Sequence, residues 1–369
     1  MTAVRADDAH AALPAHQPRR HSVAVLGATG AVGQAFIRLL ADHPWFELTE
    51  VAASERSAGR AYAEAATWIG GDAMPSAVAS MTVQPCDPKR VHAEIVFSAL
   101  DSSVAGEAEI AFARAGKFVL SNAKNHRMEP DVPLVIAEVN AAHLSILEAQ
   151  RRRRGWGGGI VTNGNCATIV TAIALAPIHQ RFGITKSILT TLQAVSGAGY
   201  PGVPSLDILG NVIPLIKDEE PKIEAELQKF LGTVAGDEIR SADFPVSAQA
   251  NRVPVEHGHT VCIAAGLAER ADAADVEAAL AEWTGDETAR GLPSAPERPL
   301  VLAEQPDRPQ PRRDVDSGRG MTVVVGRVRR DPVLDVKLVA LGHNIIRGAA
   351  GASVLNAELL VRCGYVPSA

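Results

Sequence analysis

Short apolar runs and longer helical patterns alternate along the first part of the chain. Residues 22–26 form a short apolar run, and the glycine turn GATGAVG and the helical pattern QAFIRLLADH follow it. Similar runs lie at residues 47–53, in EIVFSAL near Glu94 and in KFVL near Lys117, and VAGEAEIAFARAG between the last two fits a helix. Strands that alternate with helices predict a parallel, doubly wound sheet of an α/β protein.

The pattern changes from Asn165 onward. A long helical stretch, ATIVTAIALAPIHQRFG, precedes β-rich runs at SILTTLQAVS, RVPVEHGHTVCIAAGL and MTVVVGRVRR, which predict a second, sheet-containing domain. We interpret PERPLVLAEQPDRPQPRRDVDSGRG as an irregular excursion, because strand-like sequence resumes after it. The last stretch, LVALGHNIIRGAAGASVLNAELLVRCG, predicts a strand and then a long helix that returns to the first domain.

Length and composition agree with two domains and narrow the class of protein. The chain has 369 residues, and 47% of them are hydrophobic, which is enough for two cores. Its net charge of -6 is not that of a general nucleic-acid binder. No apolar run approaches the roughly 20 residues that cross a bilayer, so we expect no membrane partner. Residues 1–20 lack the apolar core of a secretory signal, and we interpret them as a flexible tail.

Cysteines and arginines add two expectations. The four cysteines lie far apart without a CxxC pair, so we expect no metal site, no disulfide framework and a reduced, cytoplasmic setting; they are Cys86, Cys166, Cys262 and Cys363. The four arginines at residues 151–154 precede a glycine-rich stretch, and we interpret them as a solvated loop rather than a site for an anionic partner.

The glycine turn predicts a dinucleotide site. Glycine is needed where the backbone turns tightly and approaches a pyrophosphate, and the N-terminus of the next helix offers donors to the phosphates. The turn follows a predicted strand and opens a helix, which is the context that this motif requires. We expect cofactor contacts from Gly27, Thr29, Gly30, Ala31, Val32 and Gly33.

The residues after the second strand favour NADP over NAD. An acidic residue there would bind a free ribose 2′-hydroxyl and repel a 2′-phosphate. The chain instead places Arg56 between Ser54 and Ser57, which suits a phosphate, although Glu55 argues for NAD. The alternative is that SERSAG is the capped start of a helix.

Cys166 lies in NGNCAT, directly after a polar loop and at the start of the long apolar helix. A helix N-terminus stabilises a thiolate, so we expect a lowered cysteine pKa and a nucleophile at neutral pH. A single cysteine at a helix start is more often inert, and other features must support this assignment.

Several segments of the chain provide that support. From about Ser22 to the C-terminus the sequence resembles the aspartate-semialdehyde dehydrogenase family, in its archaeal and fungal branch, which also contains malonyl-CoA reductases. The segments that carry the resemblance are GATGAVG, SNAKNHRMEPDVPLVIAEVN, NGNCAT, LQAVSGAGYPGV, NVIPLIKDEEPKIEAE, NRVPVEHGHT and HNIIRGAAGASVLNAE. Together they are highly specific.

The resemblance implies a covalent mechanism. Cys166 would attack the aldehyde carbon, hydride would pass to NADP, and phosphate would resolve the resulting thioester. His259 would be the acid/base partner, since an ordinary imidazole accepts and returns a proton near neutral pH. His257 is a rival base, because residues two apart on a strand share a face.

The resemblance also assigns the substrate contacts. Gln193 would orient the acyl group, or be a satisfied strand amide. Arg252 would pair with the substrate carboxylate, or form a structural ion pair. Glu219 and Lys222 would meet the substrate ammonium and phosphate, or form a surface i,i+3 pair. Arg127, near Lys124 and Asn122, would bind phosphate, and Asn165 beside the nucleophile completes the predicted substrate contacts.

Further cofactor contacts are expected from Ser98, Ser196, Gly197 and Asn344. Asn344 would anchor the nicotinamide amide, and its alternative is a helix N-cap. For His126 and His343 we expect surface positions or satisfied positions in the core.

The leading hypothesis is therefore an NADP-dependent L-aspartate-4-semialdehyde dehydrogenase of lysine, threonine and methionine synthesis. A malonyl-CoA reductase is the alternative within enzymes, and a catalytically silent NADP-binding regulatory protein is the alternative outside them. We expect a Rossmann-like NADP-binding domain at residues 21–165, completed by 342–369, and an α+β catalytic domain at 166–341. The resemblance implies homodimers or homotetramers that form through the second domain.

Overall fold

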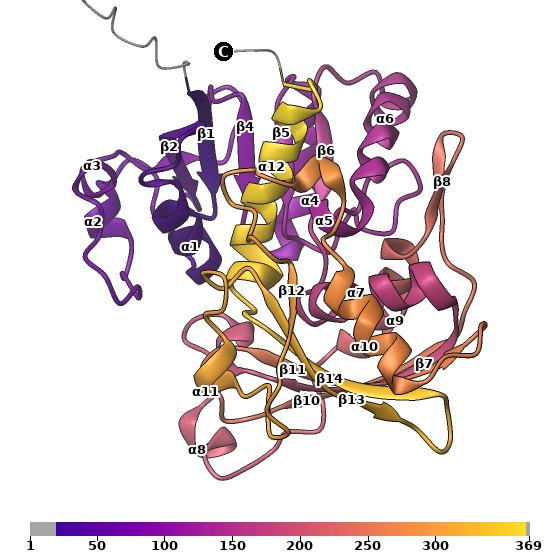
Figure 1. Cartoon of the computed structure of the whole chain (residues 1–369). Coiled ribbons are helices and arrows are strands. Elements are labelled where there is room, and N and C mark those ends of the chain that lie inside the picture. The colour runs from indigo at the N-terminus through magenta and orange to yellow at the C-terminus, as the bar shows by residue number, and fades with distance from the viewer. Residues whose placement is uncertain (1–19, 367–369) are drawn as a thin grey trace, which may run out of the picture.

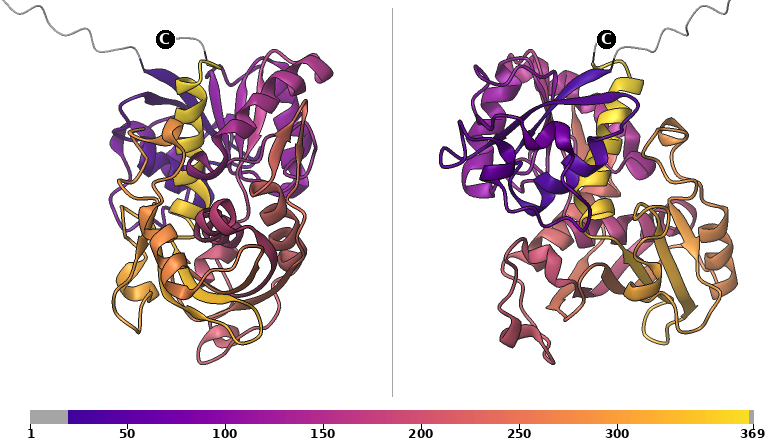
Figure 2. Two further views of the ribbon diagram at one scale, coloured as in Figure 1. Left: turned by 45° about the vertical axis from the view of Figure 1, so that its right-hand side comes forward. Right: turned by 90° about the vertical axis from the view of Figure 1, so that its left-hand side faces the viewer.

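The computed structural model describes residues 20–366 and contains two six-stranded sheets (Figure 1). The first sheet comes from the N-terminal part of the chain and the second from the later part, while the C-terminal helix lies beside the first (Figures 1 and 2). The predicted N-terminal tail lies outside the described residues, apart from Arg20. Within the described part, no helix is long and apolar enough to cross a membrane.

The first sheet is entirely parallel, as predicted. Its strand order is β3-β2-β1-β4-β5-β6, and every neighbouring pair runs parallel. The order reverses between β1 and β4, and a crevice for ligands opens at such a reversal. The strands are β1 (His21–Leu26), β2 (Phe46–Ala53), β3 (Gln84–Pro85), β4 (Ile95–Ser98), β5 (Phe118–Ser121) and β6 (Gly159–Thr162).

Both faces of this sheet are buried, which explains its nearly continuous apolar strands. Val23 and Val25 of β1 face one core, whereas Ala24 and Leu26 face another, because successive side chains in a strand point to opposite sides. Helices α1 (Ala31–Leu40) and α12 (Gly351–Arg362) cover the first face, and α4 (Ser102–Arg114) covers the second. Val25 of β1 and Leu355 of α12, which lie 330 positions apart in the sequence, thus share one core.

The second sheet is mixed, and helices cover one of its faces. Its order is β10-β7-β11-β14-β13-β12, in which β7–β10 and β12–β13 pair parallel and the rest antiparallel. Helices α7 (Cys166–Phe182), α9 (Glu219–Phe230) and α10 (Ala273–Glu282) share its core. The strands are β7 (Ile184–Gln193), β10 (Val246–Arg252), β11 (His259–Leu267), β12 (Leu300–Leu302), β13 (Val323–Arg330) and β14 (Val336–Gly342).

Shorter elements connect these layers. The remaining helical segments are α2 (Tyr62–Ala65), α3 (Ser76–Ala79), α5 (Ala137–Asn140), η1 (Ala141–Ser145), α6 (Ile146–Arg154), η2 (Val195–Ala198), α8 (Ser205–Ile208), η3 (Glu287–Ala289), α11 (Pro311–Asp314) and the π-helical turn η4 (Ile346–Ala350). A small hairpin is formed by β8 (Thr233–Ala235) and β9 (Glu238–Arg240). The sheets divide near residues 165 and 342, where the sequence predicts the domain boundaries, and those boundaries remain a prediction.

The interpretation of residues 151–154 as a solvated loop is wrong. They form the last turn of α6, which Gly155 ends in a left-handed conformation. Arg152 pairs with Asp237 at 2.7 Å, and Arg154 pairs with Glu129 and Asp131. Basic side chains at a helix C-terminus interact favourably with its dipole. The arginines therefore stabilise the helix end.

Two other expectations needed correction. The Pro- and Arg-rich excursion contains the edge strand β12 and the short helix α11, so it is part of the second sheet rather than irregular throughout. The C-terminal helix does not begin directly after its strand, because the π-helical turn η4 separates β14 from α12. Such turns are rare and often lie at functional sites.

A buried ion pair fixes η4 to the first part of the chain. Arg347 is fully buried, and its two terminal nitrogens donate to the carboxylate of Glu138 in α5 at 2.8 and 2.6 Å. Removal of one partner from such a pair leaves an uncompensated buried charge. The pair therefore holds η4 only while both residues are present.

We predict that Arg347→Met lowers the free energy of unfolding by about 3 to 5 kcal/mol, because Glu138 loses the counter-charge that it has within residues 20–366. Urea denaturation at a fixed protein concentration measures the change. Arg152→Met is the control: its ion pair is solvent-exposed, so we expect a loss of at most about 1 kcal/mol. Equal losses in the two variants would contradict the anchoring role.

Candidate active site

The glycine turn lies at the crevice of the first sheet and fits a bound dinucleotide. Gly27 has a φ of +70°, and a Cβ there would lie 2.5 Å from the Ala99 carbonyl oxygen. A Cβ on Gly33 would lie 2.3 Å from the Gly27 carbonyl oxygen. At Gly30, by contrast, the nearest atom would be 3.4 Å away. The fold thus requires Gly27 and Gly33, whereas a Cβ would fit at Gly30, where glycine instead suits close approach of a phosphate.

The residues after β2 form a turn, not the start of a helix. The Ser54 carbonyl accepts the Ser57 and Ala58 N–H groups. Arg56 is exposed, and within residues 20–366 no carboxylate lies within 4 Å of its guanidinium. Its charge is therefore available to a 2′-phosphate.

Cys166 is the first residue of α7. Asn165 caps the helix, since its side-chain oxygen accepts the Ala167 and Thr168 N–H groups at 3.0 and 3.1 Å. The Cys166 sulfur lies 3.0 Å from Nε2 of His259, the fully buried first residue of β11. The predicted nucleophile and its partner thus meet across 93 positions of sequence.

His257 does not share a strand face with His259, because β11 begins only at His259. Nδ1 of His257 lies 3.0 Å from the Ser196 hydroxyl, and the His257 ring stacks on that of His343 at 5.0 Å. His257 therefore lies in the connection before the strand, where it contacts Ser196 rather than the nucleophile.

The expectation that the helix N-terminus lowers the Cys166 pKa is wrong in this structure. Burial and the Glu219 carboxylate raise the pKa of Cys166 to about 12, although Arg252, Arg127 and the Ala167 N–H act in the opposite direction. Burial and nearby Arg252 lower the pKa of His259 to about 3. Desolvation thus disfavours the charged form of both groups. The partial charge at the helix N-terminus does not outweigh the desolvation of the thiolate.

Hydrogen bonding defines which His259 nitrogen carries the proton. Nδ1 accepts the Ala194 N–H at 3.1 Å, so the neutral ring has its proton on Nε2. That N–H lies against the Cys166 sulfur. In this state the ring is arranged to donate a hydrogen bond to sulfur or to an oxygen that develops beside it.

Gln193, Glu219 and Asn165 form one polar cluster next to the nucleophile. One Glu219 oxygen accepts Asn165 Nδ2 at 2.7 Å and Gln193 Nε2 at 3.1 Å. Lys222 lies 3.5 Å from the other oxygen. Glu219 is only 7% exposed and Lys222 lines the cavity, so this i,i+3 pair belongs to the site and not to the outer surface.

The two predicted anion-binding arginines differ in their pairing. Arg252 ends β10 and donates to the Ala194 carbonyl at 2.8 Å, and no carboxylate of residues 20–366 lies within 4 Å of it. Arg127 is paired with Glu226 at 2.8 Å and donates to the Asn122 carbonyl at 2.7 Å. The guanidinium of Arg252 is therefore available to pair with a substrate carboxylate, whereas that of Arg127 is already paired with Glu226.

The remaining predicted cofactor residues divide into two groups. Asn344 is not an N-cap: its amide accepts the Gly258 N–H at 2.9 Å and donates to the Ser196 hydroxyl at 2.8 Å, at the edge of the cavity. Gly197 lines the same cavity. Ser98 is fully buried and donates to Glu109 at 2.6 Å, so its hydroxyl points away from the crevice.

One cavity joins these parts. It has a volume of about 430 Å³, and its walls come from both halves of the chain. The glycine turn and the nucleophile line it together, as do the segments around the predicted phosphate and nicotinamide contacts; its lining includes Ala31, Val32, Asn122, Arg127, Asn165, Cys166, Ser196, Gly197, Lys222 and Asn344. A dinucleotide in the crevice and a thioester on Cys166 would therefore face one another.

Sequence reasoning missed the glycines that make this cavity possible. A Cβ on Gly348 of η4 would lie 2.5 Å from the Cys166 Cβ, so only glycine lets η4 pack on the nucleophile. A Cβ on Gly164 would lie 2.4 Å from the Phe230 ring. Both glycines lie inside segments that carry the family resemblance, but no single-sequence pattern identifies their contacts.

We predict that Glu219→Gln increases the rate of Cys166 alkylation by iodoacetamide at pH 7.5 by at least about threefold, or half a pKa unit. Removal of the carboxylate charge lowers the cysteine pKa, and the thiolate is the reactive form. In the unaltered protein the rate should rise about tenfold per pH unit from pH 7 to 9 without a plateau, because the raised pKa keeps the thiol protonated there. Peptide mass spectrometry measures the modification at Cys166.

Glu220→Gln provides the control, since Glu220 lies beside Glu219 but accepts the Ala250 N–H of β10. Its alkylation rate should match that of the unaltered protein. An unchanged or slower rate in Glu219→Gln would show that this carboxylate does not control the thiol.

Comparison with known proteins places this arrangement in a family. Residues 22–147 match the family model "Semialdehyde dehydrogenase, NAD binding domain", and residues 175–347 match "Semialdehyde dehydrogenase, dimerisation domain". The chain is 50% identical to the aspartate-semialdehyde dehydrogenase of Archaeoglobus fulgidus, over 93% of this chain and 98% of that protein. It is 46% identical to that of Schizosaccharomyces pombe, over 93% and 99%.

Solved structures agree with the sequence relatives. The aspartate semialdehyde dehydrogenase of Candida albicans with NADP matches with a TM-score of 0.86 and 44% identity, over 93% of this chain and 99% of that chain. Aspartate semialdehyde dehydrogenase II of Vibrio cholerae complexed with ASA matches with a TM-score of 0.72 and 28% identity, over the same shares. The predicted resemblance is confirmed, and the chain belongs to the aspartate-semialdehyde dehydrogenase family.

Proposed function

We propose that this protein is an NADP-dependent L-aspartate-4-semialdehyde dehydrogenase. It would interconvert L-4-aspartyl phosphate with L-aspartate 4-semialdehyde and phosphate, in lysine, threonine and methionine synthesis. The observation that carries the proposal is the 3.0 Å contact between the Cys166 sulfur and His259 Nε2, in the same cavity as the glycine turn. The relatives named above support the substrate and the cofactor.

Turns after strands of the first sheet and segments that follow β7 and β14 of the second sheet provide the residues that would hold NADP. Gly27, Gly30 and Gly33 would take the pyrophosphate, Arg56 the 2′-phosphate, and Asn344 and Ser196 the nicotinamide end. The room beside Gly30, and an Arg56 side chain that has no carboxylate partner within residues 20–366, both fit this group. When bound, the cofactor supplies a hydride acceptor in oxidation and a hydride donor in reduction.

The Cys166 thiolate forms the covalent bond to the substrate. In the oxidative direction the sulfur attacks the aldehyde carbon, and the thiol proton ends on the carbonyl oxygen, relayed by Nε2 of His259, which gives a hemithioacetal. His259 stabilises the sulfur and then the hemithioacetal oxygen through its Nε2–H. After oxidation the carbon is a thioester, and a phosphate oxygen displaces the sulfur to give the acyl phosphate. The acid/base role of His259 stays part of this proposal.

The charged groups in and around the cavity would each bind a different end of the substrate. Arg252 has no carboxylate partner in the described chain, so it would pair with the α-carboxylate. Glu219 presents a negative charge for the α-ammonium. Arg127 and Lys222 would bind phosphate, and Gln193 would orient the acyl group beside Asn165.

The cluster around Glu219 also distinguishes this proposal from a malonyl-CoA reductase. Malonyl-CoA carries a carboxylate for Arg252 but no ammonium on its acyl group. The Glu219 carboxylate is only 7% exposed, and it raises the pKa of Cys166, which disfavours the reactive thiolate. The ammonium group of a bound substrate would offset this effect. A catalytically silent NADP-binding protein would gain nothing from a buried carboxylate at this position.

We further propose that the chain works as a homodimer or homotetramer in the cytoplasm. A dimerisation domain of this family matches residues 175–347, and the first unit would comprise residues 21–165 with 342–369. The four cysteines are all free thiols, which agrees with a reducing compartment.

The activity itself can be tested directly. Purified protein given L-aspartate 4-semialdehyde, inorganic phosphate and NADP should reduce the cofactor, which absorbance at 340 nm measures. Cys166→Ala should lower the rate at least about a thousandfold, because it removes the atom that forms the thioester. Parallel assays with NAD, and with malonyl-CoA and NADPH, test the cofactor and the acyl donor. Turnover of malonyl-CoA without oxidation of the semialdehyde would replace this proposal with its alternative.

The two neighbouring histidines give a further prediction. His259→Ala should lower kcat by about 10² to 10⁴, because the hydrogen bond to the reacting atoms is lost. His257→Ala should cost far less, since that ring contacts Ser196 and His343 instead. Steady-state kinetics on both variants measure the difference. Equal losses would mean that the wrong histidine has been assigned.

A further inference from the structure

Helix α9 presents a charged face to the active site. Glu219, Lys222, Glu226 and Lys229 follow one another at spacings of three, four and three residues, which places them on one side of a helix. Three of them, Glu219, Glu226 and Lys229, are less than a tenth exposed. Charged side chains are rarely buried unless they are paired, so each requires a partner in the core.

Glu226 has two such partners. One of its oxygens accepts Nη1 of Arg127 at 2.8 Å, and the other accepts the backbone N–H of Asn165 at 2.5 Å. Asn165 directly precedes the nucleophile and caps its helix. A single carboxylate, only 2% exposed, therefore connects the predicted phosphate-binding arginine to the peptide next to Cys166.

Lys229 holds the other side of the same segment. Its ammonium group donates to the carbonyl oxygens of Arg127, Glu129 and Val132 at 2.6, 2.8 and 2.9 Å. All three donors of the lysine are thus used on residues 127–132. Burial lowers the pKa of Lys229 to about 8, and the three carbonyls compensate for its lost hydration.

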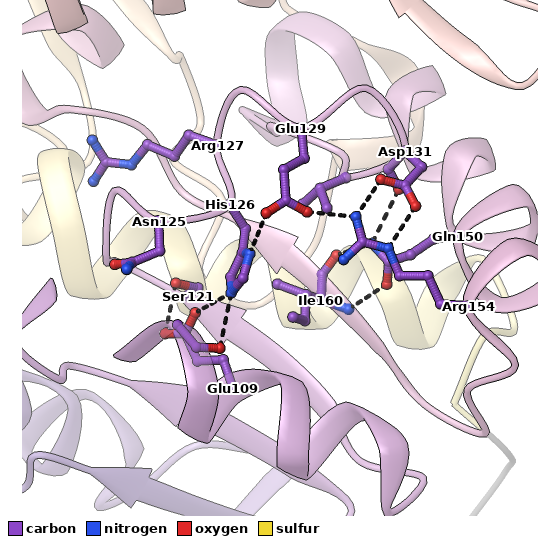
Figure 3. A network of polar contacts seen from close by, with 12 residues as sticks. Glu109, Ser121, Asn125, His126, Arg127, Glu129, Asp131, Gln150, Arg154 and Ile160 are labelled. Atoms are coloured by element: carbon purple, nitrogen blue, oxygen red, sulfur yellow. Dashed lines mark hydrogen bonds and ion pairs between the residues drawn. The ribbon is translucent and has the colours of Figure 1, made fainter. Parts of the chain in front are cut away.

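Residues 126–131 are also held by side chains of the helices that lie beside the first sheet. His126 lies 2.7 Å from Glu129, Glu129 pairs with Arg154, and Glu109 accepts the Ser121 hydroxyl at 2.8 Å. Figure 3 shows that Arg127 points away from this network. Its guanidinium therefore depends on Glu226 and on the Asn122 carbonyl for its position, and its Nε has no hydrogen-bond partner in the described chain.

We propose that Glu226 is a positioning residue that ties Arg127 to the peptide before Cys166, so that bound phosphate lies at a set distance from the thioester. The proposal rests on the function proposed above, in which Arg127 binds phosphate. Glu226 itself does not line the cavity, so it acts through Arg127. Each of its two carboxylate oxygens accepts one donor, and an amide would replace one of these oxygens with an NH2 group that cannot accept.

Glu226→Gln tests this role with almost no change in shape. The glutamine presents one acceptor and one N–H to two donors, so Arg127 or the Asn165 N–H is displaced. We expect the KM for phosphate to rise at least about tenfold, the effect of one lost charge-assisted hydrogen bond. The KM for the semialdehyde should stay within about twofold, because Arg252 binds that end. Glu226→Asp, which keeps both oxygens, should recover part of the loss.

The matched control lies on the same helix. Glu224 accepts one backbone N–H, that of Ala248, at 3.0 Å, and a glutamine oxygen can still accept it. Glu224→Gln should therefore leave both KM values unchanged. Thermal melts of the two variants identify any general loss of stability.

A double-variant cycle separates positioning from general damage. In an Arg127→Gln background, Glu226→Gln should change the KM for phosphate by less than about twofold, because the residue acts through Arg127. If the increases in the KM for phosphate in the two single variants multiply in the double variant, the proposal is overturned. Tighter phosphate binding in Glu226→Gln alone, which is the result expected if Glu226 merely neutralises Arg127, would also overturn it.

Titration calorimetry with inorganic phosphate keeps this test independent of turnover. If the unaltered protein fails to oxidise the semialdehyde, the proposed function fails, and the calorimetric affinities still decide the role of Glu226. An affinity for phosphate at least about tenfold weaker in Glu226→Gln supports it. An affinity within about twofold of the unaltered protein overturns it.

Discussion

The desolvation of Cys166 beside His259 is the constraint on which the rest of the site depends. Desolvation raises the pKa of the thiol and lowers the pKa of the adjacent imidazole, so the charged form of each group is disfavoured. The surrounding cations of Arg252 and Arg127 act against this barrier, while Glu219 adds to it. A substrate ammonium beside Glu219 would cancel the unfavourable charge and favour the thiolate. Substrate binding and activation of the nucleophile are thereby linked by electrostatics.

The second sheet and the returning C-terminal segment build this environment together. β11 supplies His259, β10 supplies Arg252, and η4 packs on the Cβ of Cys166 through Gly348. The buried Arg347–Glu138 pair then fixes η4 to the first unit. Because these elements belong to different parts of the chain, the nucleophile lies at their common junction and not within either sheet.

The sequence predicted the parts of the fold that local patterns encode. The parallel first sheet, the glycine turn and Cys166 at a helix start all follow from short segments, and the family motifs identified His259. The raised pKa of Cys166 was not predictable from the sequence. It depends on the charge of Glu219, which lies 53 positions away along the chain and acts on the sulfur only in the folded protein.

Other features were missed for the same reason. In α9, the spacing of Glu226 and Lys229 is also that of an ordinary solvated helix face, and only their partners on residues 127–132 and 165 make it a buried one. The strands β3 and β6 are short, and β3 has only two residues, so neither gives a clear alternating pattern. The arginines of residues 151–154 resembled a loop because their acidic partners are distant in sequence.

The place of α12 has a consequence for biosynthesis of the chain itself. Val354, Leu355 and Leu359 complete the same core as Val23 and Val25 of the first strand. A ribosome delivers the N-terminal strands first, and α1 covers part of their apolar face, but the part that α12 covers stays exposed until the last helix emerges. The strands of the second sheet are already outside the ribosome by then. The first sheet therefore completes its core only after the second sheet has been synthesised, and a C-terminal truncation would damage the start of the molecule rather than its end.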